Sequence, residues 1–173
     1  MASFLAVFTG LVAAIDAVRL PRPSGEYYIG QTQHVFNHTT LQDPLANGTT
    51  KQYLLATIYF PSPAPPLLNE TVLYVDPINF KIWANALQYP NGSISTIQTW
   101  WNFQSPTLNA STGNPTIIFS PSGGAPIWGY SALLSDLASR GYPLFSLDHP
   151  GEVPFTRLPF EGRSIYELDI KHE

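Results

Sequence analysis

Residues 115–151 read PTIIFSPSGGAPIWGYSALLSDLASRGYPLFSLDHPG, and this stretch decides the fold. It opens with Thr116-Ile-Ile-Phe119, a short apolar run of the kind expected for a parallel strand buried on both faces. Ser120-Pro-Ser-Gly-Gly-Ala-Pro126 then forms a tight, glycine-bearing turn. At the far end, Pro143-Leu-Phe-Ser-Leu-Asp148 has the length and composition of a second strand.

An amphipathic helix is predicted between these two strands. Its apolar side chains fall at i, i+3, i+4 and i+7, on one helical face: Tyr130, Leu133, Leu134 and Leu137. Gly141 stands in the position that commonly ends a helix. Strand, turn, helix and strand within about 35 residues make a βαβ unit, which implies a parallel sheet. The predicted class is therefore α/β with a mostly parallel sheet.

The preceding residues add further elements. Lys51–Phe60 is a β-branched and aromatic run closed by prolines, which predicts a strand. Asn79–Leu87 carries apolar residues at helical spacing. Val35-Phe36, Val72–Val75 and the aromatic patch Gln98–Phe103 are candidate short strands.

Composition excludes several functions. Cysteine is absent, so disulfides, thiolate nucleophiles and cysteine-based zinc sites are ruled out for this sequence. The net charge is −4 and the 8 Lys and Arg are scattered, which gives neither a nucleic-acid footprint nor a polybasic membrane segment. Only 12% of residues are charged, about half the usual share, so neutral polar groups, glycans or partner surface must keep the protein soluble.

The first 17 residues are predicted to be a signal peptide. An apolar run from Ala2 to Ala17 is too short to span a bilayer, and small residues at Ala14 and Ala17 offer cleavage positions. The usual basic n-region is missing, and a buried N-terminal helix is the alternative. Residues 18–173 would then form the mature domain, which we expect to be secreted.

Five Asn-x-Ser/Thr sequons support a secretory route, because glycans would compensate for the low charge. The predicted N-glycosylation sites are Asn37, Asn47, Asn69, Asn91 and Asn109.

Together, these segments resemble the platelet-activating-factor acetylhydrolases, which are serine esterases of the α/β-hydrolase fold. The resemblance rests on the order of Phe119–Gly124, Tyr130–Tyr142 and Ser146–Pro150. Leu20–Gly25, the Tyr53–Pro61 strand and Phe160–Ser164 are also similar to parts of that family. It is patchy but collinear from about Leu20 to Tyr166.

The resemblance implies an oxyanion loop at Ser120–Gly124, with Gly123 as donor and Gly124 beside it. Backbone N–H groups in such a loop stabilise the tetrahedral intermediate of acyl transfer. Pro121 and Ser122 depart from the family's His-Gly pair, which reduces the freedom of the loop. A tight turn that lets helix and strand pack closely is the structural alternative for the two glycines.

The residues of a catalytic triad are not present as this fold would need them. No Gly-x-Ser-x-Gly elbow occurs in the sequence. None of the four histidines, His34, His38, His149 and His172, follows a candidate elbow and acid. In this fold nucleophile, acid and base follow the last predicted strand, so we expect a truncated α/β-hydrolase domain whose triad lies beyond Glu173.

Two functions follow as expectations. The first is a secreted carboxylic ester hydrolase of the acetylhydrolase type, acting on a small-molecule or lipid ester without metal or cofactor, and inactive as this chain. The second is a non-catalytic secreted glycoprotein fragment that binds lipid or protein. An open sheet edge would also permit self-association.

The remaining polar and aromatic candidates favour structural roles. Adjacent strand residues point to opposite faces, so Asp148 and His149 are a polar strand-end pair rather than a metal site. Ser131 lies on the predicted helix and not in a nucleophile elbow, so we predict that it is an ordinary surface hydroxyl. Trp100 and Trp101 could line a ligand cleft, but paired tryptophans are more often core or interface anchors.

Overall fold

The computed structural model describes residues 18–38, 52–65, 72–90, 94–107, 112–149, 153–159 and 164–166. The predicted signal peptide, residues 1–17, lies outside these ranges. The same holds for four of the five predicted glycosylation sites, Asn47, Asn69, Asn91 and Asn109. Asn37 is described, and it is exposed near the end of the first strand.

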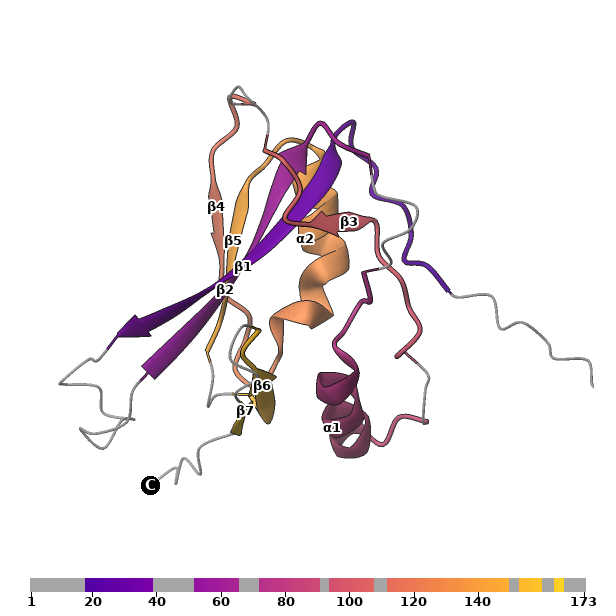
Figure 1. The fold of residues 1–173 in the computed structure, drawn as a ribbon, viewed down its shortest axis with the longest axis vertical. Helices are drawn as coiled ribbons and strands as arrows, with labels where there is room; N and C mark the ends of the chain where they lie inside the picture. Colours follow the sequence, from indigo (N-terminus) through magenta and orange to yellow (C-terminus); the bar gives the residue numbers. More distant parts are fainter. Residues whose placement is uncertain are drawn as a thin grey trace, which may run out of the picture.

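A five-stranded sheet forms the centre of the fold, in the order β3-β1-β2-β5-β4 (Figure 1). The strands are β1 Tyr28–His38, β2 Gln52–Ser62, β3 Trp101–Phe103, β4 Ile117–Phe119 and β5 Leu144–Asp148. The pairs β1–β3 and β4–β5 are parallel, whereas β1–β2 and β2–β5 are antiparallel. The α/β-hydrolase-like class is therefore confirmed, and the described sheet is mixed where a mostly parallel one was expected.

The antiparallel character comes from β1, of which the sequence predicted only Val35-Phe36. Eleven residues of β1 pair with β2 in one continuous register, from Tyr28↔Ser62 to His38↔Gln52. Polar side chains hid this strand, because Gln31 and Gln33 lie among its apolar residues. Pairing with a neighbour supplies the backbone hydrogen bonds that fix such a strand, whatever its own propensity.

The predicted βαβ unit is present. β4 leads through the short helix η1, Ile127–Tyr130, into α2, Ser131–Ser139, and then into β5, which pairs in parallel with β4. Gly141 ends the helix with φ of +96°, as its position predicted.

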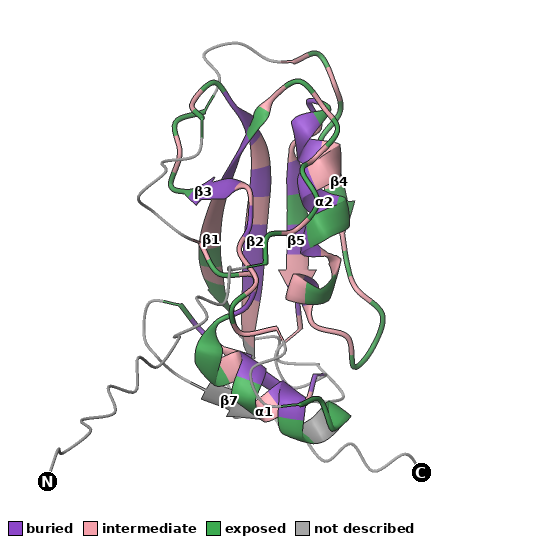
Figure 2. Cartoon of the chain, turned by 90° about the vertical axis from the view of Figure 1, so that its right-hand side faces the viewer, coloured by how far each residue is buried: buried purple, intermediate pink, exposed green. Residues whose placement is uncertain are grey.

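Helix α2 packs three of the four predicted residues in the core: Leu134 is fully buried, and Tyr130 and Leu137 pack against the same cluster. The exception is Leu133, which is 53% exposed. Ala138 and three serines complete the buried face: Ser131, Ser135 and Ser139. Figure 2 shows the buried residues of α2 in purple. Each of the three serines donates its hydroxyl to the carbonyl three residues earlier, so all three of these buried hydroxyls are paired. Ser131 is thus a buried residue, and its predicted surface position was wrong.

β4 lies at the edge of the described sheet. Ile118 in its centre is 75% exposed, so this apolar run is not buried on both faces as predicted. Phe145, its partner in the parallel register, is also 37% exposed on that face. The described helix α2 covers only the opposite face (Figure 1).

A smaller group of elements lies at one end of the sheet. It holds α1, Pro77–Leu87, beside the two-stranded sheet of β6, Phe155–Arg157, and β7, Ser164–Tyr166 (Figure 1). Asp76 caps α1 by accepting hydrogen bonds from two of its first backbone N–H groups. The predicted strand over Val72–Val75 is reduced to one bridge, between Leu73 and Gln98.

Candidate active site

Two parallel neighbours, β4 and β5, reach the same edge of the sheet at their carboxyl ends. Such edges are where α/β sheets commonly place their ligand sites. β4 runs into the loop Ser120–Pro126, here called the glycine loop, and β5 ends at Asp148. The parallel register, Phe119↔Ser146, brings the start of the glycine loop beside the end of β5.

Asp148 anchors the exit of the glycine loop. Its Oδ1 accepts a hydrogen bond from the backbone N–H of Ile127 at 2.8 Å, and the residue is only 5% exposed. Burial raises the pKa of this carboxyl to about 6, with the Ile127 hydrogen bond acting weakly in the other direction. The site therefore holds a carboxyl group that gains and loses its proton close to neutral pH.

The two glycines of the loop face solvent. Both are exposed, and a Cβ added to Gly123 or Gly124 would meet no atom within 4 Å. Gly124 has φ of +78°, a conformation that favours glycine, and Ala125 closes the turn by donating to the Ser122 carbonyl at 3.1 Å. Within the described residues, no backbone carbonyl accepts from the N–H groups of Gly123 or Gly124. These donors are available to a bound group.

A serine and a histidine meet beside the glycines. Ser120 Oγ lies 2.9 Å from His149 Nε2, although the two residues are 29 positions apart. Asp148 and His149 therefore point to different partners, Ile127 and Ser120, as their expected opposite orientation requires. His149 was predicted only as a polar strand-end residue, and its contact with the Ser120 side chain was not predicted. The signal available was the position of both residues just beyond predicted neighbouring strands.

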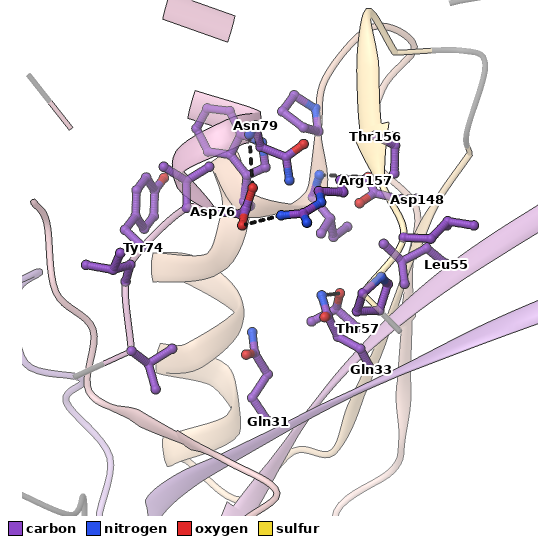
Figure 3. A pocket seen from close by; sticks show the side chains of 18 of the residues that line it. Gln31, Gln33, Leu55, Thr57, Tyr74, Asp76, Asn79, Asp148, Thr156 and Arg157 are labelled. Carbon is purple, nitrogen blue, oxygen red and sulfur yellow. Dashed lines mark hydrogen bonds and ion pairs between the residues drawn. The ribbon is translucent and has the colours of Figure 1, made fainter. Parts of the chain in front are cut away.

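A cavity of about 560 Å³ lies next to the loop, within the size range of small-molecule sites (Figure 3). Pro126, Ile127, Trp128 and Asp148 connect it to the loop. Figure 3 shows that side chains from β1, β2, α1 and β6 point into it, among them Gln31, Gln33, Thr57, Asn79 and Arg157.

The cavity wall is mainly neutral. Gln33 donates to Thr57 Oγ1 at 3.2 Å, and burial raises the pKa of both Tyr59 and Tyr74, so these phenols stay protonated. The one ion pair at the wall joins Arg157 to Asp76 at 3.2 Å, among the described residues. Because Arg157 is already paired with Asp76, the cavity wall suits a neutral ligand better than an anionic one.

The two neighbouring tryptophans make packing contacts and also line cavities. Trp100 donates to the Leu20 carbonyl, the Arg19 guanidinium lies over its ring at 4.6 Å, and the residue lines a second, smaller cavity. Trp101 is 3% exposed, packs edge-on against Tyr59 and lines the cavity beside the glycine loop. The arrangement is consistent with both roles considered for the pair, packing anchor and cleft lining.

The described residues contain neither a metal-binding cluster nor a membrane-spanning helix. No cluster of three or more His, Cys, Asp or Glu side chains in these ranges could hold a metal ion. In the same part of the chain, no helix is both long and apolar enough to cross a membrane.

Comparison with known proteins gives a fold but not a family. No protein-family profile matches the sequence. No curated protein sequence matches it either. Among solved structures, a ferulic acid esterase from Streptomyces cinnamoneus superposes with a TM-score of 0.72 at 23% sequence identity. The match covers 87% of this chain and 41% of the esterase chain, so the chain spans about two fifths of that structure's length. The chain thus shares the α/β-hydrolase-like fold of an esterase.

Proposed function

We propose that this chain carries the oxyanion loop of a secreted carboxylic ester hydrolase of the platelet-activating-factor acetylhydrolase type. The observation that carries the proposal is the pair of N–H groups at Gly123 and Gly124, which donate to no backbone carbonyl in the part of the chain that the structure describes. They lie on a solvent-facing loop at the carboxyl end of β4, beside a cavity of ligand size, in a fold shared with an esterase.

The proposed chemistry of the loop is electrostatic. When a nucleophile attacks an ester carbonyl, negative charge develops on the carbonyl oxygen. Two fixed N–H donors aimed at that oxygen stabilise the charge without having to reorganise. Asp148 supports this arrangement, because its bond to Ile127 fixes the end of the loop to the sheet.

The remaining catalytic groups would come from polypeptide that these 173 residues do not contain. The sequence has no Gly-x-Ser-x-Gly elbow, and the match covers 41% of the esterase chain. We therefore propose that these residues alone lack triad-driven turnover. In the complete enzyme the triad would form an acyl-serine and hydrolyse it, with no metal or cofactor.

The substrate proposal follows from the cavity and the resemblance. The neutral wall, with aromatic and amide side chains, suits an uncharged acyl or glyceryl portion of an ester. A short or oxidised sn-2 acyl group on a phospholipid is the substrate class that the resemblance implies. Secretion is proposed from the apolar leader and the five sequons.

The test begins with the transcript. Sequencing through the codon for Glu173 should reveal a continuing frame with an elbow serine, then Asp and His. The longest encoded chain should hydrolyse a short-acyl phospholipid, and Gly123→Pro, which removes the N–H donor, should lower kcat by about 10²-fold or more. Gly123→Ala keeps the donor and meets no neighbouring atom, so it is the matched control and should retain activity.

A longer chain with a triad but no esterase activity would contradict the proposal, and so would an unchanged kcat in Gly123→Pro. If instead the frame stops at Glu173, the non-catalytic alternative gains support. One feature favours it: the uncovered sheet face at Ile118 and Phe145 is apolar and exposed. Binding of the purified chain to phosphatidylcholine vesicles would then be measured.

A further inference from the structure

We propose that Ser120 and His149 form a nucleophile–base pair that accepts an acyl group from activated carboxylic esters. This site lies wholly within the chain and is independent of any elbow serine. Its central observation is the 2.9 Å distance between Ser120 Oγ and His149 Nε2, which is within the range for proton transfer from a nucleophile to its base.

The sheet itself brings the two residues together. Ser120 follows β4 directly and His149 follows β5 directly, and these strands are parallel neighbours. The contact is solvent-exposed, so an ester can reach the hydroxyl. The glycine loop begins at the same serine and leaves the N–H groups of Gly123 and Gly124 unpaired within the described residues. Nucleophile, base and candidate oxyanion donors thus lie on one short loop and the adjoining strand end.

The reaction balances with groups present in the chain. In the tautomer with its proton on Nδ1, His149 accepts the Ser120 hydroxyl proton at Nε2 while Oγ attacks the ester carbonyl carbon. The tetrahedral intermediate collapses, the C–O bond to the leaving group breaks, and its electron pair departs with the alkoxide or phenoxide. The products are acyl-Ser120 and an alcohol, after the imidazolium returns its proton to solvent or to the leaving group.

The arrangement also limits the substrate class. A triad's third member orients the base, but the Asp148 Oδ1 is engaged by the Ile127 N–H. Among the described residues, the one side-chain hydrogen bond of His149 is the one with Ser120. Such a pair activates the serine less than a triad does, so the acceptor should react with esters of good leaving groups, such as phenyl esters, rather than with amides. We expect a single acylation followed by slow release.

The experiment uses the purified chain with p-nitrophenyl acetate as the probe. Release of nitrophenolate is followed in time, and the acetylated residue is identified by peptide mass mapping. One acetyl group per chain should be found at Ser120, and Ser120→Ala should abolish it. His149→Gln keeps a hydrogen-bonding group but no base and should slow acetylation at least ten-fold. Ser24→Ala is the matched control, because Ser24 is an exposed serine outside the glycine loop that contacts Asp136.

A further variant separates chemistry from folding. The chain has no cysteine, so Ser120→Cys introduces a single thiol whose acylation can be measured alone. Its rate should fall when combined with His149→Gln. Acetyl groups confined to other residues, or equal rates with and without His149, would overturn the proposal. Neither result bears on the proposed esterase, whose nucleophile is the elbow serine of the longer chain.

Discussion

Asp148 Oδ1 accepts the backbone N–H of Ile127 at 2.8 Å, a bond that joins the end of β5 to the first residue after the glycine loop. The carboxylate is buried, so it takes up a proton more readily in the folded chain than in the unfolded one. Asp148, which anchors the glycine loop, therefore also makes the free energy of unfolding depend on pH.

Asp148→Asn should flatten that pH dependence. The pKa rises from 3.8 to about 6 on folding, so Asp148 favours the native state at low pH and disfavours it as pH rises through 4 to 6. At 1.36 kcal/mol per pKa unit, the free energy of unfolding should fall by about 3 kcal/mol across this window. The variant keeps the acceptor for Ile127 and should lack this fall. Urea denaturation at pH 3.5 and 7.5 measures it, and Asp136→Asn, at a partly exposed carboxylate whose pKa is lowered by Ser24 and Arg140, is the comparison. An equal pH dependence in Asp148→Asn and the unaltered chain would contradict the assignment.

Leu134→Ala should destabilise the fold far more than Leu133→Ala. Leu134 is fully buried against the sheet, whereas Leu133 is 53% exposed. A buried leucine cut to alanine costs about 2–5 kcal/mol, whereas an exposed one costs about 0.5 kcal/mol or less. Chemical denaturation of both variants gives the difference. Equal losses would mean that Leu133 is as deeply packed as Leu134.

Gly25→Ala should destabilise the chain, because a Cβ at this position would lie 2.1 Å from the Ser139 carbonyl oxygen. That carbonyl also accepts the N–H of Tyr27, so the backbone cannot withdraw without losing a bond. We expect a loss of about 1–3 kcal/mol in the free energy of unfolding. Gly123→Ala, with no atom near its new methyl group, serves as the control and should melt like the parent chain. A normal melting temperature for Gly25→Ala would show that the two segments lie farther apart.

Ile118→Lys should reduce self-association. Ile118 is 75% exposed in a strand at the edge of the described sheet, and such edges pair with other chains unless a charge prevents it. Sedimentation velocity should show less oligomer for this variant at equal concentration. Leu133→Lys adds the same charge at another exposed apolar position and should change the distribution little. A monomeric parent chain would remove the basis for this prediction.

The sequence predicted the βαβ unit because its signals were local. Glycines stand at both ends of the helix, and β5 is a short, mainly apolar run closed by a polar pair. Most of β1 was not predicted because its glutamines face the cavity beside β2, and that environment exists only once the two strands have paired. Periodicity could not reveal the buried serines of α2 either, because a hydroxyl bonded to its own helix packs like a small apolar group.

The sequence predicted the glycines of the candidate site but not the contacts between its side chains. Gly123 and Gly124 stood out because a turn between strand and helix favours glycine. The contact between Ser120 and His149 depends on which strands are neighbours and on their register, which the sequence alone leaves open. The bond from Ile127 to Asp148 is set by that same register together with the length of the loop.

The serines on the inner face of α2 have one more effect. Ser131, Ser135 and Ser139 are buried and have short side chains, so α2 can approach the strands more closely than longer side chains there would allow. The size of these side chains therefore affects how far the preceding glycine loop stands from the edge of the sheet. A wider residue at Ser135 would tilt the helix outward and carry the glycine backbone with it. The position of the glycine loop thus depends on serine side chains on the buried face of α2, which no ligand would touch.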